Sequence, residues 1–404
     1  MCKHPTPGAN LAIAQVFRRF ARAYRNTHPL ADQPARVLRD IEQCRTPALG
    51  GHLYRCETCR QQVMLYHSCL NRHCPTCQGP AQYRWIAQRH RRLLNAPYFH
   101  VVFTLPAVLR NVIIAHPRPL LALLFRAVAQ SLHVFATDPK RLGARPAFTL
   151  VLHTWTREML YHPHLHAIVA AGGLSADGSR WVPVPNSDFL FPVAALSKVL
   201  RGKFLDGFIE LCRAGAIDLS AQASRRLVRE AKTQDWVVFA KKPFGGPAQI
   251  VNYLGRYTHR VAISTARLVS VSDDAIVFRT RGERTCSITP EEFIRRFLLH
   301  VLPHQFFKIR HYGLLAPANV TTRLVRAQQI LGVLPDPSDP GQELADADTD
   351  PAPTTSERHP ITTEADDRAP TPVDPAAPAC PHCGGRLVAF TPRRSHLPHG
   401  PPDA

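Results

Sequence analysis

Two Cys-x2-Cys pairs constrain the fold of this chain more than any other feature of its sequence. Cys56 and Cys59 form the first pair, Cys74 and Cys77 form the second, and fourteen residues separate the two pairs. Each pair can present two thiolates to one metal ion, and two pairs complete the tetrahedral site that zinc prefers. We therefore predict that these four cysteines bind a structural zinc ion, which folds a segment too short to bury its own core.

Further cysteines and histidines around these pairs are candidates for additional zinc ligands. Four of them could form a second zinc site: Cys44, His52, Cys69 and His73. The alternative for these four is ordinary packing, with one histidine in contact with DNA. Near the end of the chain, Cys380 and Cys383 supply half of a site, which His396 and His399 could complete.

The charge of the chain is basic and unevenly distributed. The 404 residues carry a formal net charge of +20, yet residues 335–379 hold eleven acidic residues and two arginines, a net charge of −9. The remaining residues therefore carry +29. A basic body with an acidic segment favours nucleic acid over a membrane surface as its partner. The alternative is a basic protein that has no polyanionic partner.

The apolar segments are short. The N-terminus lacks the pattern of a secretory signal, and no run approaches the roughly 18 apolar residues of a membrane span. We therefore expect a cytoplasmic, nucleoid-associated protein that does not enter a membrane. In a reducing cytosol the eleven cysteines are more suited to metal binding than to disulfides.

Hydrophobic periodicity predicts a mixture of helices and antiparallel strands, which is an α+β fold. Residues 147–156 and 164–170 are expected to form a hairpin, and residues 335–379, with ten prolines, a disordered linker. The other elements are expected as helices over 10–43, 107–136, 193–214 and 290–301, a basic helix after the cysteines, and strands over 99–106, 236–240, 267–272 and 275–280.

Two histidines in the second strand of this hairpin are candidate metal ligands. His164 and His166 are two residues apart in an apolar strand, so both side chains lie on one face. A lone histidine there is usually a core residue, but a pair can share an ion. With a turn near 159–160, His153 falls opposite His166 and becomes the candidate third ligand, with Gln249 as the competitor. Oxygen-rich substrates suit Mg²⁺ or Mn²⁺ at such a site.

Two tyrosines later in the chain are candidate nucleophiles. Tyr253 and Tyr257 have the i, i+4 spacing that places both phenols on one face of a helix. The alternative is a half-buried aromatic stripe, which the interleaved Arg256 and Arg260 argue against. We expect four cations to bind DNA phosphates: Arg256, Arg260, Lys241 and Lys242.

Together these motifs resemble the HUH endonuclease superfamily. Phe103-Thr104-Leu105 is similar to its first strand motif, although Pro106 stands where threonine often follows. His164-Leu165-His166 resembles its metal motif, and Tyr253-Leu254-Gly255-Arg256-Tyr257 resembles the tyrosine motif of rolling-circle initiators. Three further segments are similar to the two-tyrosine transposases of rolling-circle insertion sequences: residues 71–78, 162–166 and 257–260.

The resemblance implies a ferredoxin-like antiparallel sheet, with the histidines on a central strand and the tyrosine helix alongside. It also implies metal-dependent cleavage and strand transfer of single-stranded element ends through 5′-phosphotyrosine. The chain would divide into a helical, zinc-ribbon-like DNA-binding domain (1–95), a catalytic domain (96–334), the acidic linker (335–379) and a small Cys-containing tail (380–404). Two rival functions remain open: a zinc-dependent DNA-binding protein without catalysis, and a metal-dependent phosphodiesterase that uses water.

Overall fold

The computed structural model describes residues 13–186, 189–244, 262–332 and 379–390. Several predictions concern residues outside these ranges. They include the tyrosine helix with Tyr253 and Tyr257, the cations Arg256 and Arg260, the candidate ligand Gln249, and almost all of the acidic linker. These features stay predictions.

A six-stranded antiparallel sheet forms the centre of the molecule, and we call it the central sheet. Its strands run in the order β11-β4-β5-β3-β7, and β6 pairs with the end of β5. The strands are β3 (Tyr98–Thr104), β4 (Arg145–Trp155), β5 (Tyr161–Leu174), β6 (Trp181–Pro183), β7 (Val238–Phe244) and β11 (Ile309–Gly313). With helices between β3 and β4 and between β5 and β7, this is the expected ferredoxin-like arrangement, and β5 lies in the middle.

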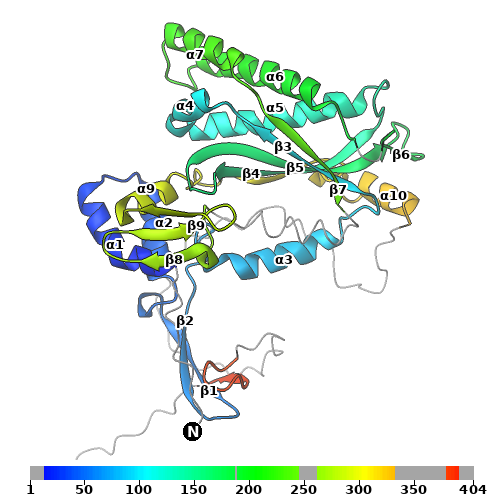
Figure 1. Cartoon of the computed structure of the whole chain (residues 1–404). Coiled ribbons are helices and arrows are strands. Elements are labelled where there is room, and N and C mark those ends of the chain that lie inside the picture. The colour runs from blue at the N-terminus through cyan, green and yellow to red at the C-terminus, as the bar shows by residue number, and fades with distance from the viewer. Residues whose placement is uncertain (1–12, 187–188, 245–261, 333–378, 391–404) are drawn as a thin grey trace, which may run out of the picture.

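Four helices cover one face of the central sheet (Figure 1). Alternate residues of the strands, such as Phe103, Leu165 and Ala167, are fully buried against them. Because successive side chains of a strand point to opposite faces, these apolar positions leave the residues between them on the other face. The helices are α4 (Arg110–Ala115), α5 (Pro117–Thr137), α6 (Val193–Arg213) and α7 (Ala221–Thr233).

Helix α5 is the longest apolar element of the described chain. Its length and composition alone would allow a membrane span, and among the described helices no other meets that test. Twelve of its 21 residues are buried, and the apolar ones among them pack into the same core as Phe103 and Leu165. The apolarity of α5 is therefore accounted for by its place in the core.

The opposite face of the central sheet is covered at one end. There Ile168 and Ala170 of β5 share a small core with Leu94, Leu324 and Ala327. The covering elements are α10 (Arg323–Ile330) and the segment that follows α3 (Gln78–His90), and Figure 1 shows both on this side. The histidine end of β5 lies beyond this cover.

The N-terminal helices share a core with a later part of the chain. The aromatic rings of Phe17 and Phe297 meet edge to face at 4.9 Å between centroids. One helix was expected over 10–43, and the structure has two, separated at His28-Pro29-Leu30, where proline disfavours helix for the residue before it. The elements of this core are α1 (Ile13–Thr27), α2 (Asp32–Gln43), β8 (Leu268–Val271), β9 (Ile276–Arg279), β10 (Thr285–Ile288) and α9 (Pro290–Leu298).

Besides the three-stranded sheet β10-β9-β8 of this core, another three-stranded sheet extends away from the rest of the molecule (Figure 1). It consists of β1 (Gly51–Cys56), β2 (Gln62–Tyr66) and β12 (Leu387–Ala389), in the order β12-β1-β2. We call it the small sheet. Its outer strand comes from the far end of the chain, more than 300 residues after β1.

Candidate functional site

The central position of β5 fixes the two histidines of the predicted metal motif. Leu165 between them has no exposed surface and packs under the helices. His164 and His166 must therefore point to the opposite face, where both are only partly buried. A strand hydrogen-bonded on both sides holds these side chains more precisely than a loop would.

His153 on the neighbouring strand β4 joins this pair. Each of the three histidines offers a ring nitrogen, and these nitrogens lie within 4.8 Å of one another. The expected register was wrong by two residues, because His153 pairs with His164 and Val151 pairs with His166. The shift arises because the turn lies earlier than expected: Trp155 pairs with Tyr161, which centres the turn at residue 158. The ring of His153 still reaches that of His166, with centroids 4.3 Å apart.

Hydrogen bonds orient the imidazoles. The Nδ1–H of His164 donates to the carbonyl oxygen of His162 at 2.7 Å, which leaves Nε2 of His164 with a lone pair. Nδ1 of His166 bonds Nε2 of His100 at 2.8 Å, and the two rings stack. When His166 donates in this bond, its own Nε2 also has a lone pair. Trp155 stacks on His153 with 4.6 Å between centroids.

Burial keeps the imidazoles of His100, His164 and His166 neutral. Loss of hydration lowers the pKa of His164 to about 4 and that of His100 to about 4. It also lowers the pKa of His166 well below its usual value, with the neighbouring histidines adding to the effect. Neutral imidazole is the form that binds metals. The three close nitrogens therefore fit one divalent ion.

Other residues line the same face of the central sheet. Thr104 of the first predicted motif pairs with His164 across β3 and β5, and both are half-buried. Lys241 of β7 pairs with His100, and its side chain is exposed. Lys242 follows in the same strand, but its side chain is outside the described part of the chain. The sheet thus places a cation two strands from the histidine cluster.

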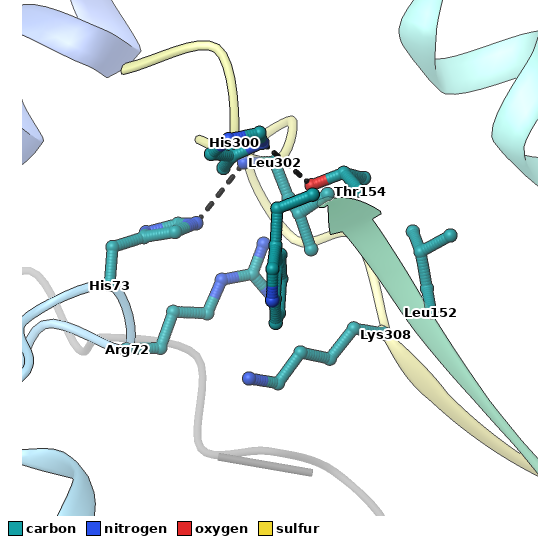
Figure 2. Close-up of a pocket in the computed structure, with 8 residues that line it drawn as sticks. Arg72, His73, Leu152, Thr154, His300, Leu302 and Lys308 are labelled. Atoms are coloured by element: carbon teal, nitrogen blue, oxygen red, sulfur yellow. Dashed lines mark hydrogen bonds between the residues drawn. The ribbon is translucent and has the colours of Figure 1, made fainter. Parts of the chain in front are cut away.

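A pocket joins this sheet to residues 67–77, which we call the cysteine-rich loop (Figure 2). Arg72 of the loop donates to the carbonyl oxygens of Phe306 at 2.6 Å and Pro303 at 3.0 Å. The Nε2 atom of His73 accepts a hydrogen bond from the backbone N–H of Leu302 at 3.1 Å. Both residues therefore fix the loop to the segment that precedes β11.

His300 completes the junction on the side of the sheet (Figure 2). Its Nδ1 atom bonds the hydroxyl of Thr154 at 3.1 Å, and its Nε2 atom bonds the carbonyl oxygen of Met159 at 3.1 Å. Sequence reasoning missed His300, His100 and Trp155. Each is a polar or aromatic residue inside or beside an apolar strand, which was the signal available in the sequence. That signal does not reveal a role, because the residues that these side chains contact can lie far away in the sequence.

The cysteines form two clusters whose membership differs from the predicted one. Cys74 and Cys77 lie with Cys44 and Cys69, and the sulfur of Cys77 is 3.5 Å from that of Cys44 and 3.6 Å from that of Cys69. Four sulfurs around a zinc ion at about 2.3 Å are roughly 3.8 Å apart, so this cluster fits zinc. Contacts with neighbouring thiols lower the pKa of Cys77 to about 4, which favours a thiolate.

The prediction that Cys56, Cys59, Cys74 and Cys77 bind one zinc ion is corrected by the geometry of the β1–β2 hairpin. Cys56 and Cys59 lie at the turn of the β1–β2 hairpin, whereas Cys44 and Cys69 lie at its base. A six-residue strand spans about 20 Å, too far for one ion to bind both Cys-x2-Cys pairs. His52 and His73 do not join either described cluster, since His52 contacts His67 and His73 bonds Leu302.

At the turn of the β1–β2 hairpin, the first Cys-x2-Cys pair lies against the pair near the end of the chain. Cys56 and Cys59 lie with Cys380 and Cys383, and all four ligand atoms are within 4.8 Å of one another. The distances are 3.5 Å between the sulfurs of Cys56 and Cys383, and 3.7 Å between those of Cys59 and Cys380. This cluster also fits zinc by distance. His396 and His399, the expected partners of Cys380 and Cys383, lie outside the described residues.

Comparison with known proteins gives consistent matches along the chain. Residues 147–323 match the family model described as "Putative transposase", and residues 16–105 match the model described as "Transposase zinc-binding domain". The chain is 43% identical over 343 residues to "Putative transposase y4qJ" of Sinorhizobium fredii (strain NBRC 101917 / NGR234), covering 81% of this chain and 86% of that one.

A second relative is more distant. The chain is 32% identical over 303 residues to the transposase for insertion sequence element IS801 of Pseudomonas savastanoi pv. phaseolicola, covering 69% of this chain and 71% of the relative. No solved structure matches the chain significantly.

Proposed function

Because this chain belongs to the transposase family of the IS91 and IS801 insertion sequences, we propose that it cuts and rejoins single-stranded DNA with tyrosine nucleophiles. Tyr253 and Tyr257 would attack the scissile phosphates, and a divalent ion on His153, His164 and His166 would assist. The substrate would be the single-stranded ends of the element. A protein that carries out this reaction would act in the cytoplasm, in association with the nucleoid.

One observation carries the proposal: the imidazoles of His153, His164 and His166 gather on the face of the central sheet opposite the four helices. Structural histidines in a core have their nitrogens bonded to protein groups, as His300 does. In this cluster, one ring nitrogen of each of the three histidines lies within 4.8 Å of the other two, and the Nδ1 bond of His164 leaves its Nε2 atom with a lone pair. That donor set binds a cation and offers open positions for phosphate oxygens.

The chemistry divides among the residues as follows. A bound divalent ion would draw negative charge from the oxygens of the scissile phosphate. The phenol oxygen of one tyrosine attacks phosphorus in line, and the bond from phosphorus to the 3′ oxygen breaks. The phenol gives up its proton, the 3′ oxygen takes one up and leaves as a 3′-hydroxyl, and the 5′ end stays on the tyrosine. One phosphodiester replaces another, so no ATP is required.

The surrounding cations would serve binding and activation. A phenol has a pKa near 10, so its ionisation in the transition state needs nearby positive charge. Arg256 and Arg260, interleaved with the tyrosines, would supply it and hold the DNA backbone. Lys241, exposed two strands from the histidine cluster, would bind a flanking phosphate. Lys242 would do the same further along the strand.

The identity of the ion follows from its donors. Three nitrogen ligands suit Mn²⁺ better than Mg²⁺, which prefers oxygen ligands and keeps its water molecules. We therefore expect Mn²⁺ to support cleavage at lower concentrations than Mg²⁺. Equal activity with both ions at every concentration would contradict a site built from three imidazoles.

An adduct assay tests the nucleophile. The protein is incubated with an oligonucleotide from the end of its insertion sequence and Mn²⁺, and the products are run on denaturing gels. We expect a covalent protein–DNA species that the double variant Tyr253→Phe/Tyr257→Phe fails to form. Tyr66→Phe, in the small sheet, is the matched control and should form it normally.

The other outcomes point to the rival functions. Cleavage without an adduct would indicate a phosphodiesterase that uses water. DNA binding with neither adduct nor cleavage would indicate a binding protein without catalysis. Either result would refute the proposal.

A further inference from the structure

The second cysteine cluster unites residues from opposite ends of the chain. We propose that Cys56, Cys59, Cys380 and Cys383 bind one structural zinc ion, and that this ion fastens the C-terminal segment to the β1–β2 hairpin. The matched zinc-binding domain covers residues 16–105, so it contains only two of these ligands. The inference does not depend on the proposed cleavage chemistry.

The two halves of the site have the same backbone geometry. In the first, the N–H of Arg60 donates to the carbonyl oxygen of Cys56 at 3.1 Å, and the N–H of Cys56 donates to Gln61 at 2.9 Å. In the second, the N–H of Gly384 donates to Cys380 at 2.8 Å, and the N–H of Cys380 donates to the carbonyl of the next glycine at 2.7 Å. Two matching turns therefore present their thiols to one point.

The residue after each second cysteine has a left-handed backbone. The φ angle is +61° at Arg60 and +75° at Gly384. Glycine adopts this conformation without cost, whereas arginine pays for its Cβ atom. A turn that keeps this geometry with arginine is held by its surroundings, and four sulfurs around one ion would supply that restraint.

Backbone pairing supports the contact between the two ends. β12 pairs with β1, with Tyr54 opposite Ala389 and Cys56 opposite Leu387. Beyond the ladder, the N–H of Phe390 donates to the carbonyl oxygen of Leu53 at 2.8 Å, and the guanidinium of Arg55 lies over the ring of Phe390 at 3.8 Å. Without the C-terminal segment, β1 and β2 would be an isolated two-stranded hairpin, which is marginally stable in water.

The packing is close enough to require glycine at one position. A Cβ atom at Gly385 would lie 2.4 Å from Oγ1 of Thr58 and 3.0 Å from the sulfur of Cys56. The core of the small sheet is otherwise minimal: its fully buried members are Cys56, Cys380 and Leu387. So small a core cannot offset the entropy of fastening two segments more than 300 residues apart, and the zinc ion would provide the missing free energy.

Zinc stoichiometry gives the first test. The purified full chain should contain two zinc ions, one in each cysteine cluster. The variant Cys380→Ser/Cys383→Ser should contain one, and the control Cys212→Ser/Cys286→Ser, in cysteines outside both clusters, should keep two. Two ions in the Cys380→Ser/Cys383→Ser variant would refute the shared site.

Retention of the cut C-terminal segment gives the second test. A protease recognition sequence replaces part of residues 345–355, which contain no cysteine. After cleavage, we expect the C-terminal piece to elute with the body, and a zinc chelator to release it. Cys380→Ser/Cys383→Ser should release it without the chelator.

Gly385→Val is the informative second variant, because it keeps every cysteine but blocks the contact with Thr58 and Cys56. It should also release the piece after proteolysis. Release from the unmodified chain, or retention that neither the chelator nor these substitutions affect, would overturn the proposal.

Discussion

The central sheet and the small sheet are stabilised in different ways. The central sheet buries large side chains such as Phe103 and Phe148 under four helices, so its fold does not require the histidine cluster. The small sheet buries three residues, two of which are cysteines of the proposed zinc site. A metal should therefore serve chemistry in the first region and folding in the second.

Cys56→Ser should produce the largest effect of this comparison. The binding free energy of a structural zinc ion is on the order of 10 kcal/mol, more than so small a core can replace. We expect amide hydrogens of β1 and β2 to lose their protection from exchange completely, while those of β4 and β5 keep it.

Cys212→Ser, a partly buried cysteine of α6, is the control for that exchange measurement. It should leave the protection of both sheets unchanged. If β1 and β2 stay protected in Cys56→Ser, the small sheet is stable without its metal and the comparison fails.

In contrast to Cys56→Ser, His164→Ala should greatly reduce activity and leave the fold stable. DNA cleavage should fall at least about a hundredfold, which is typical for loss of a group that stabilises transition-state charge. The free energy of unfolding should change by about 1 kcal/mol or less, since the side chain is partly exposed and lies outside the main core. Cleavage rates and urea unfolding of the same preparation measure both quantities.

His162→Ala is the matched control for His164→Ala. It lies two residues away on the same face, and its carbonyl oxygen, which accepts the bond from His164, is retained. It should keep most of the activity. Equal losses in both variants would mean that the face as a whole, rather than the metal cluster, supports cleavage.

The same contrast explains what could be predicted from the sequence. The apolar alternation around His164 and His166 is local, so it predicted a strand and the shared face of the two histidines correctly. The ferredoxin-like sheet was expected from the family resemblance, because the pairing of distant strands leaves no local pattern. The strands β1 and β2 are only six and five residues long, and the sequence pattern did not predict them. Without this hairpin, the two Cys-x2-Cys pairs were assigned to one ion. Pairing of Cys56 with Cys383 spans most of the chain and has no local signature.

An effect of intermediate size is expected from His100, which lies next to the histidine cluster. His100 bonds Nδ1 of His166 and is 3% exposed. Removing such a supporting group usually lowers metal affinity about 10- to 100-fold. His100→Ala should therefore need more Mn²⁺ for half-maximal cleavage and should recover near-normal rates at saturating Mn²⁺.

His311→Ala is the control for His100→Ala, because His311 lies on the edge strand β11 and bonds Thr149 on the same face of the sheet. It should leave the Mn²⁺ requirement unchanged. A rate loss in His100→Ala that saturating Mn²⁺ does not restore would show that His100 acts in some other way.

The smallest effect is expected at the junction between the cysteine-rich loop and the central sheet. Burial lowers the pKa of His300 to about 4, against about 6.5 in the unfolded chain. The unfolded state therefore binds more protons between these values, and stability is lost as the pH falls through this window. Between about pH 6.5 and 5.5 this loss is about 1 kcal/mol for one such histidine.

His300→Gln should remove this pH dependence, because glutamine does not titrate and keeps a donor and an acceptor for Met159 and Thr154. Urea unfolding across this pH range should give a flatter profile than in the unmodified protein. The exposed His304→Gln variant is the control and should leave the profile as it was. An unchanged slope in His300→Gln would place the acid sensitivity of the protein elsewhere, with buried His73 on the other side of the junction as the next residue to substitute.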